Sequence, residues 1–251
     1  MRMRLVVNEF AKMRHLRVGA LVLVLLTGVV GLTAFRGLAS GMTAQLGDPA
    51  GFPWKILLAG LGFSAGLISP LVIAAIASRQ VEAEHAGNGW LLSATSGVTP
   101  GRMCRSKFLA LGALVTAATV LQSLILIAIG FGLGITSPLP LEHWLGYTAA
   151  VIVVNLAVLA AHLLLSSTIE NQLVCMGIAV IGLFIAVFGS ALPDWLAMLT
   201  PWGYYALTAP ADYIGTDLVY LDIPYLRVML LGLVGVCLFS LITARFDRRE
   251  E

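Results

Sequence analysis

Six long apolar stretches dominate this chain and constrain what it can fold into. They run over residues 18–35, 56–78, 108–135, 145–166, 172–192 and 226–244. A helix needs about 20 apolar residues to cross the hydrocarbon core of a membrane, and each stretch is close to that length. Only 11% of the residues are charged, whereas a soluble domain carries roughly 25%. The sequence therefore predicts an all-α, polytopic membrane protein with six transmembrane helices in one domain, residues 1–251.

Two other interpretations of the apolar stretches fit less well. Runs of about ten alternating apolar and polar residues, typical of transmembrane β-barrel strands, do not occur. The basic N-terminus, the apolar run 18–30 and the small residues at 37–40 resemble a secretory signal peptide with its cleavage site. The basic region is long for a signal peptide, however, and we interpret the first stretch as a retained signal anchor.

The basic residues predict the orientation of the six spans. Twelve of the fifteen Lys and Arg residues lie in the tail 1–17, the segment 79–107 and the C-terminal tail. The other three are Arg36, Lys55 and Arg227. Loops rich in Lys and Arg stay in the cytoplasm, so we expect both termini there and the protein in a bacterial plasma membrane. A net charge of +2, spread along the chain, gives no indication of a nucleic-acid partner.

Metal binding and disulfide formation have no pattern to support them. The three cysteines are Cys104, Cys175 and Cys237, and they form no CxxC motif and no cluster with histidine. The four histidines are far apart in the sequence. We expect no metal site and no catalytic residue in this chain.

The polar segment 79–106 between the second and third stretches divides into three parts. Glu82 and Glu84 form a polar exit from the second span. The following NGWLLSATS, residues 88–96, predicts a short amphipathic helix, because Trp90 and Ala94 are four residues apart and share a helix face. Local chemistry leaves two interpretations of this helix open. It is either an ordinary loop that Trp90 anchors in lipid, or an element that docks on a partner.

The third part of the segment, TPGRMCRSKF, has the form of a helix start. Thr99 is expected to cap the helix and Pro100 to occupy its first position. Long basic side chains at a span's end can extend to lipid phosphates. We expect this of Arg102, Arg105 and Lys107.

At these residues the chain resembles the permease subunits of ABC-2 type ABC transporters. Members of that family carry a pattern of the kind E-x-x-x-G-x-x-x-x-L-x-x-x-P-x-x-R-x-x-x-x-K between spans two and three. The residues that supply this order are Glu82, Glu84, Gly87, Gly89, Leu91, Leu92, Pro100, Arg102 and Lys107. The chain departs from the pattern around SATSGVTPG, where a glycine separates Pro100 from Arg102.

Three further segments carry the resemblance. AEHAGNGWLLSAT is similar to the lantibiotic and bacitracin immunity branch of the family. Glu9 and Lys12 in NEFAKMRHLR are similar to an N-terminal E-x-x-K pattern, and LTPWGYYALTAP resembles the outer segment before the last span. The resemblance covers the whole chain in architecture and these short motifs in residues.

The resemblance implies a coupling helix that docks on a separate ATP-binding subunit. The implied coupling residues are Glu82, Glu84, Trp90, Leu91, Leu92, Arg102 and Lys107. The lysines of this chain follow Ala11, Trp54 and Ser106, so the Gly-Lys pair of a phosphate-binding loop is absent. We therefore expect this chain to bind no cofactor, and ATP and Mg²⁺ to bind to the partner.

The implied assembly contains two ATP-binding subunits and a second permease, either identical or paralogous, surrounded by membrane lipids. Its implied activity is export of an amphipathic substrate, such as an antimicrobial peptide, a drug or a lipid. Among these substrates, the similarity to the immunity branch favours an antimicrobial peptide. The corresponding role is lantibiotic immunity or antibiotic resistance.

Polar residues within the spans are candidates for a substrate path, because an unpaired polar group is costly in lipid. Gln122 and Asn155 are expected near the middle of their spans. Their side chains could hydrogen-bond to each other or form hydrogen bonds that join helices. His162 is either a pathway group or a satisfied interfacial histidine. The small residues at 60–66 indicate close helix packing, with a dimer axis as one option.

The segment 193–225 is expected to be extracellular and is rich in aromatic residues. Asp194 after Pro193 predicts a short helix start. Trp202, Tyr204 and Tyr205 are candidates for an outer gate. The alternative is an aromatic belt at the membrane interface.

Two rival functions remain open on the sequence. GFSAG, residues 62–66, fits the G-x-S-x-G motif of intramembrane serine proteases, with Ser64 and His162 as the candidate pair. The two residues are much further apart in sequence than such enzymes place them. The other rival is an accessory or channel-like membrane protein without ATP coupling.

Overall fold

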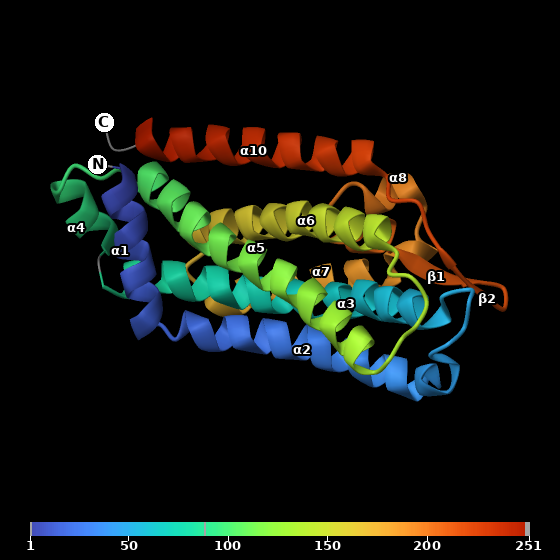
Figure 1. The fold of residues 1–251 in the computed structure, drawn as a ribbon. Helices are drawn as coiled ribbons and strands as arrows, with labels where there is room; N and C mark the ends of the chain where they lie inside the picture. Colours follow the sequence, from blue (N-terminus) through green and yellow to red (C-terminus); the bar gives the residue numbers. More distant parts are fainter. Residues whose placement is uncertain (1, 88, 249–251) are drawn as a thin grey trace.

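The protein, described by a computed structural model over residues 2–87 and 89–248, is an elongated bundle of helices (Figure 1). Six helices within this range are long and apolar enough to cross a membrane. They are α2 (Val18–Ala39), α3 (Phe52–Ala86), α5 (Pro100–Gly132), α6 (Leu141–Thr168), α7 (Gln172–Phe188) and α10 (Tyr225–Arg248). The predicted all-α, polytopic membrane fold with six spans is confirmed.

Short helices lie at the end of the bundle that holds both chain ends, which we call the basic end (Figure 1). They are α1 (Arg2–His15) and α4 (Gly89–Thr95). The helix predicted for residues 88–96 is therefore present as α4. Seven residues are too few for a helix to be stable in water without tertiary contacts, so neighbouring elements must hold α4 in place.

The opposite end, which we call the hairpin end, carries irregular structure and one small sheet. The 3-10 turns are η1 (Met42–Gln45), η2 (Gly189–Ala191) and η3 (Pro201–Gly203), and the short helices are α8 (Asp194–Ala197) and α9 (Tyr204–Leu207). Strands β1 (Ala211–Ile214) and β2 (Asp217–Tyr220) pair antiparallel, with Ala211 opposite Tyr220. The start of α8 at Asp194 follows the sequence prediction. The hairpin, with its two four-residue strands, was not predicted.

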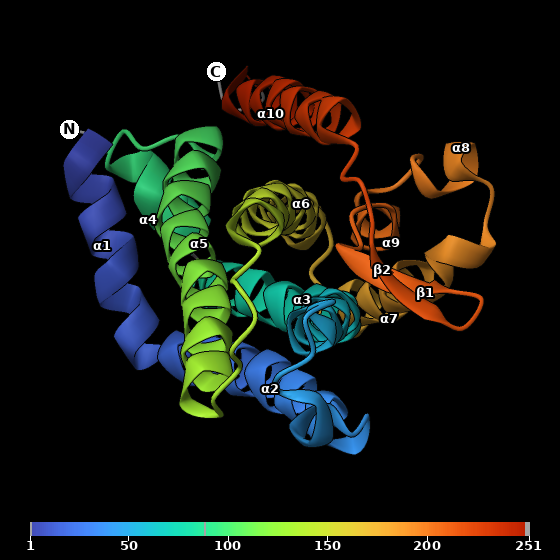
Figure 2. The same ribbon diagram turned by 45° about the vertical axis from the view of Figure 1, so that its right-hand side comes forward.

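Helix α3 forms the centre of the bundle, and α10 lies at its edge (Figure 2). The small residues of α3 explain its central position. A Cβ atom on Gly60 would lie 3.2 Å from Thr33 of α2, and one on Gly62 would lie 2.9 Å from Pro210. The predicted close packing of this face is confirmed. Because these neighbours belong to the same chain and cover the face, the option that it forms a dimer axis is wrong.

Two helices extend further at the basic end than the apolar stretches indicate. Helix α3 continues through Glu82 and Glu84 to Ala86, and α5 begins at Pro100, before the apolar stretch starts at residue 108. Apolar stretches mark the part of a helix that lipid covers, and polar turns can extend beyond it. Pro100 occupies the predicted first position, but the Thr99 side chain makes no capping hydrogen bond.

Candidate functional site at the basic end

Five polar residues from three helices form a buried charge cluster at the basic end, which we call the Lys107 cluster. Its members are Glu9 and Lys12 of α1, Gln80 and Glu84 of α3, and Lys107 of α5. Lys107 is fully buried, and its Nζ lies 2.8 Å from Glu9 Oε2 and 2.7 Å from Glu84 Oε1. The same ammonium donates to the Gln80 carbonyl oxygen at 3.0 Å. All three donors of Lys107 are thereby used.

Lys12 completes the cluster from its exposed side. Its Nζ lies 3.0 Å from Glu9 Oε1 and 2.7 Å from Glu84 Oε1, and Gln80 Nε2 donates to Glu9 Oε2 at 2.8 Å. Burial alone would lower the pKa of Lys12, but the hydrogen bonds and charges of Glu84 and Glu9 outweigh burial and raise it. Two carboxylates thus balance two ammonium groups, the condition under which buried charge is tolerated.

The cluster corrects one expectation about Lys107. We expected its side chain to extend to lipid phosphates, but it points between α1 and α3 with no exposed surface. The reason is helical periodicity: Lys107 lies five residues after Arg102, so the two side chains leave α5 in different directions. Arg102 is exposed. Arg105 instead turns to α10, where it lies 2.6 Å from Asp247 Oδ2 and donates to Thr243 Oγ1 at 3.0 Å.

Helix α4 is attached to the bundle through Trp90. The Trp90 ring is half-buried and packs edge-on against the His85 ring, with 5.8 Å between centroids. His85 Nε2 lies 3.0 Å from the carbonyl oxygen of Ser166 at the end of α6. The Trp90 ring therefore packs against protein. The loop interpretation instead expects this ring to be anchored in lipid. The side chain of Leu92 is 64% exposed, Glu82 is also exposed, and the side chain of Leu91 lies outside the described part.

Glycines at two positions allow the close approaches of this region. A Cβ atom on Gly89 would collide with the Glu84 carboxylate, so only glycine lets α4 begin directly above the Lys107 cluster. A Cβ atom on Gly101 would collide with the Thr243 carbonyl oxygen and the Asp247 carboxylate of α10. The glycine between Pro100 and Arg102, which departs from the family pattern, thus permits contact between the first turn of α5 and the last turns of α10.

Three residues of this region carry no clear signal in the sequence. Gln80 is one of several polar residues in the segment 79–106, Asp247 lies in a basic tail, and Gly101 reads as a simple interruption. Each acquires its role from a contact with a residue more than 70 positions away, such as the bond from Gln80 to Glu9, 71 residues apart. Periodicity and local motifs do not register such contacts.

The polar residues predicted within the spans join helices. Gln122 Nε2 donates to the Leu25 carbonyl oxygen of α2 at 3.2 Å. Asn155 Nδ2 donates to Thr119 Oγ1 at 2.9 Å, and the Tyr205 hydroxyl donates to Asn155 Oδ1 at 2.6 Å. Gln122 and Asn155 therefore bond to other partners and not to each other.

The aromatic segment at the hairpin end turns back into the bundle. Tyr204 and Tyr205 are buried, with 6% and 3% of their surface exposed. The Trp202 ring packs where Gly182 of α7 leaves space and lies 5.6 Å from the His162 ring. The aromatic-belt interpretation is wrong for Tyr204 and Tyr205, because both lie inside the protein. Trp195, Tyr213 and Tyr225 are at least half exposed, as a belt requires.

Ser64 and His162 do not form the pair that a serine protease needs. Ser64 Oγ and both ring nitrogens of His162 are buried without a hydrogen-bond partner in the described structure. A nucleophile must be within hydrogen-bond reach of its base, and here neither group bonds to the other. His162 is also not the satisfied histidine that we considered, since neither of its ring nitrogens has a hydrogen-bond partner in the described structure.

Comparison with known proteins identifies the family. A family model described as ABC-2 family transporter protein matches residues 5–186. The match contains all five members of the Lys107 cluster and the whole of α4. A search of curated proteins finds no match to the chain. Since the family model covers well over half of the 251 residues, this chain belongs to the ABC-2 transporter family and is a membrane subunit of the permease type.

Proposed function

We propose that this permease docks on an ATP-binding subunit through α4 and drives export with the ATP hydrolysed there. ABC-2 permeases generally pair with an ATP-binding subunit. One observation carries the proposal: α4 presents the exposed apolar side chain of Leu92 at the basic end. An apolar side chain on a short surface helix suits insertion into a groove on a partner protein.

Contacts behind α4 support a coupling role. Trp90 joins α4 to His85 of α3, and His85 in turn contacts the end of α6. The Lys107 cluster ties α1, α3 and α5 together directly beneath. A displacement of α4 would therefore reach α3 and α6 through His85, and α1 and α5 through the Lys107 cluster. Glu84 and Lys107 act in this proposal as positioning residues, and Glu82, Leu92 and Arg102 are the exposed candidates for direct contact.

The proposed assembly follows from the resemblance described above. Two ATP-binding subunits, with ATP and Mg²⁺, associate with this chain and a second permease, identical or paralogous. The basic end faces the cytoplasm of a bacterial cell, in agreement with the distribution of Lys and Arg. The substrate is an amphipathic molecule, and the AEHAGNGWLLSAT segment favours an antimicrobial peptide of the lantibiotic type.

Docking is tested with Leu92→Asp and a matched control. Tagged chain is purified from its native host in mild detergent, and ATP hydrolysis and the associated ATP-binding subunit are measured. Leu92→Asp places a charge in the proposed apolar contact, so we expect both signals to fall to background. The control is Ile214→Asp at the hairpin end, because Ile214 is 65% exposed and Leu92 is 64% exposed. We expect the control to resemble the unmodified protein.

Two results would contradict the proposal. Normal ATP hydrolysis with Leu92→Asp would show that α4 does not dock on the partner. Absence of any ATP-binding subunit from the unmodified, folded protein would favour the accessory or channel-like alternative. The substrate is tested separately, by comparing the sensitivity of cells with and without the permease to a lantibiotic.

A further inference from the structure

We propose that the basic end holds an anionic phospholipid, with its phosphate at Arg102 and Arg105 and an acyl chain in the groove between α5 and α10. The site lies outside α4 but shares Arg102 with the residues that could contact an ATP-binding subunit. It does not rest on docking, and its test therefore uses the purified chain without that subunit. Three features carry it: a cavity with both arginines in its wall, a helix α5 that is longer than the hydrocarbon core, and an apolar groove that adjoins the cavity.

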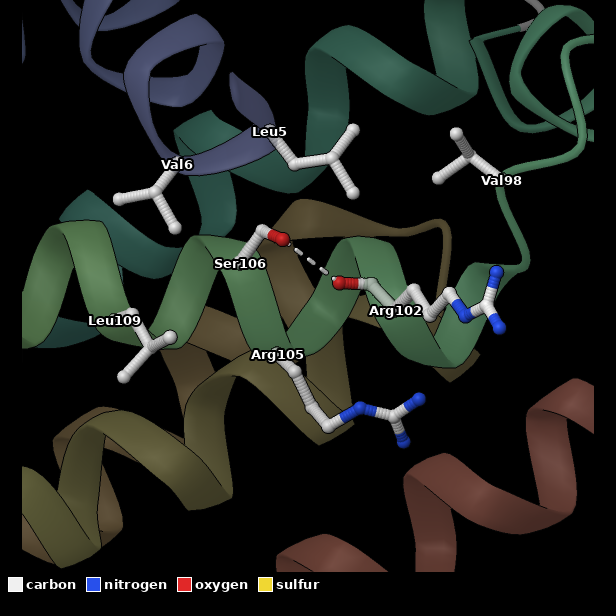
Figure 3. A pocket seen from close by; sticks show the side chains of 7 residues that line it. All are labelled: Leu5, Val6, Val98, Arg102, Arg105, Ser106 and Leu109. Atoms are coloured by element: carbon white, nitrogen blue, oxygen red, sulfur yellow. Dashed lines mark hydrogen bonds between the residues drawn. The ribbon is translucent and has the colours of Figure 1, made fainter. Parts of the chain in front are cut away.

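The cavity lies beside the first turns of α5 and has a volume of about 480 Å³. Figure 3 shows Leu5 and Val6 of α1 on one side and Arg102, Arg105 and Leu109 of α5 on the other. Its volume falls within the usual range for small-molecule sites, about 300–1,000 Å³. The lining combines two guanidinium groups with apolar side chains, which matches a molecule that has a charged head and an apolar tail.

The charges around the cavity favour a phosphate. Arg105 uses two of its five N–H donors on Thr243 and Asp247, and these bonds hold its guanidinium in place. Asp247 balances the charge of Arg105, while Arg102 makes no ion pair with any described residue. The charges of the nearby Lys107 cluster cancel. The lining therefore has a surplus of one positive charge, and guanidinium groups suit phosphate oxygens in both shape and charge.

The depth of the arginines matches a lipid headgroup. Helix α5 has 33 residues, which at 1.5 Å per residue is about 50 Å, whereas the hydrocarbon core is about 30 Å thick. About 20 Å of α5 must therefore extend beyond the hydrocarbon core. We assign the polar first turns, with Arg102 and Arg105, to this part, at the level of the lipid headgroups. Leu109, which is 60% exposed, begins the part of α5 that faces acyl chains.

An apolar groove of about 210 Å³ adjoins the cavity and shares Arg105 and Leu109 with it. Its walls come from α5, α6 and α10 and include Phe108, Val236 and Phe239. The Phe108 and Phe239 rings lie 4.9 Å apart and form its floor between α5 and α10. A free phosphate ion would leave this groove empty, whereas a phospholipid fills it with an acyl chain. The occupant we assign is therefore a phospholipid.

The test is native mass spectrometry of the purified chain from nanodiscs that contain equal amounts of phosphatidylglycerol and phosphatidylcholine. We expect the unmodified protein to retain one phosphatidylglycerol in preference to phosphatidylcholine. Arg102→Gln should lower this preference about fivefold, the effect of one basic residue near a lipid surface. Leu109→Gln keeps both arginines but makes the groove polar, and should also lower retention.

The matched control is Arg79→Gln, which removes an exposed positive charge at the same end but outside the cavity. We expect phosphatidylglycerol retention to be unchanged. Equal loss with Arg79→Gln would show a general surface charge effect and overturn the proposal. Equal retention of both lipids by the unmodified protein would do the same. Full displacement of the lipid by excess inorganic phosphate would show an anion site without a lipid tail.

Discussion

At the scale of single residues, Lys107 shows how this chain manages buried charge. It occupies a fully buried position, yet each of its three donors has an oxygen partner. The chain has few charged residues, and here four of them lie in one place. Burying charge in this way is costly unless the charges are paired and hydrogen-bonded. The cluster therefore specifies one arrangement of α1, α3 and α5, because separating them would leave an unpaired charge.

Replacing Lys107 with methionine is expected to destabilise the protein strongly. Lys107→Met leaves two buried carboxylates with only Lys12, and breaking a buried ion pair costs about 3–5 kcal/mol. Unfolding in detergent by heat or denaturant measures the loss. The control is Lys12→Met, since the Lys12 side chain is 40% exposed and exposed pairs contribute about 0–1 kcal/mol. Equal losses in the two variants would show that burial does not set the strength of the cluster.

At the scale of elements, α4 depends on its neighbours for its structure. It has seven residues, so its own hydrogen bonds cannot stabilise it. The contact between Trp90 and His85 fixes one face of α4, and Leu92 on the same helix is exposed. A cavity of about 240 Å³ between α1, α4 and α5 reaches Glu9 and Lys12, which leaves α4 loosely packed on that side. The described contacts that hold α4 on the bundle are therefore concentrated at Trp90.

Removal of the Trp90 ring should loosen α4 on the bundle and leave the neighbouring helices in place. We expect Trp90→Ala to increase amide hydrogen exchange in residues 89–95 and to leave α3 and α5 unchanged, because local opening follows the number of buried apolar contacts. Hydrogen-exchange mass spectrometry in detergent or nanodiscs reads this out directly. Leu92→Ala serves as the comparison, since the Leu92 side chain is mostly exposed. Unchanged exchange with Trp90→Ala would indicate that other contacts hold α4.

At the scale of the whole molecule, the two ends of the bundle differ in the type of contact that holds them together. The basic end holds charged contacts between helix ends, including Arg105 with Asp247. The hairpin end holds short elements and aromatic residues that turn back into the bundle, such as Tyr205, which bonds to Asn155. Since six spans separate these ends, a membrane around the bundle would expose one end on each side.

Cysteine labelling in cells tests which end faces the cytoplasm. In a Cys237→Ser background, Leu92→Cys and Ile214→Cys are compared, because both positions are similarly exposed and Cys104 and Cys175 are buried. The positive-inside rule predicts that the basic end faces the cytoplasm. A membrane-impermeant maleimide should therefore label Ile214→Cys in intact cells and Leu92→Cys only after permeabilisation. The reverse pattern would show the opposite orientation, and labelling of both in intact cells would exclude a transmembrane arrangement.

The sequence by itself determined the six spans, the helix at 88–96 and the helix start at Pro100. These features follow from length, polarity and local backbone preference, all of which act between residues close in the chain. The resemblance to the family also identified Glu9, Lys12, Glu84 and Lys107, but in two separate motifs and without indicating that they meet. Their assembly around one buried ammonium joins residues up to 98 positions apart, and no local rule specifies such a pairing.

Only the tertiary structure decided how these pieces meet. In the folded chain Lys107 points inward and Arg102 is exposed. Helix α10 approaches Gly101 so closely that a side chain there would collide with it, and the Tyr205 hydroxyl bonds to Asn155. Ser64 and His162 form no hydrogen bond with each other. The physical reason is the same in each case. A polar group within a bundle must find a partner on another helix, and the packing of the helices determines which partner lies within reach.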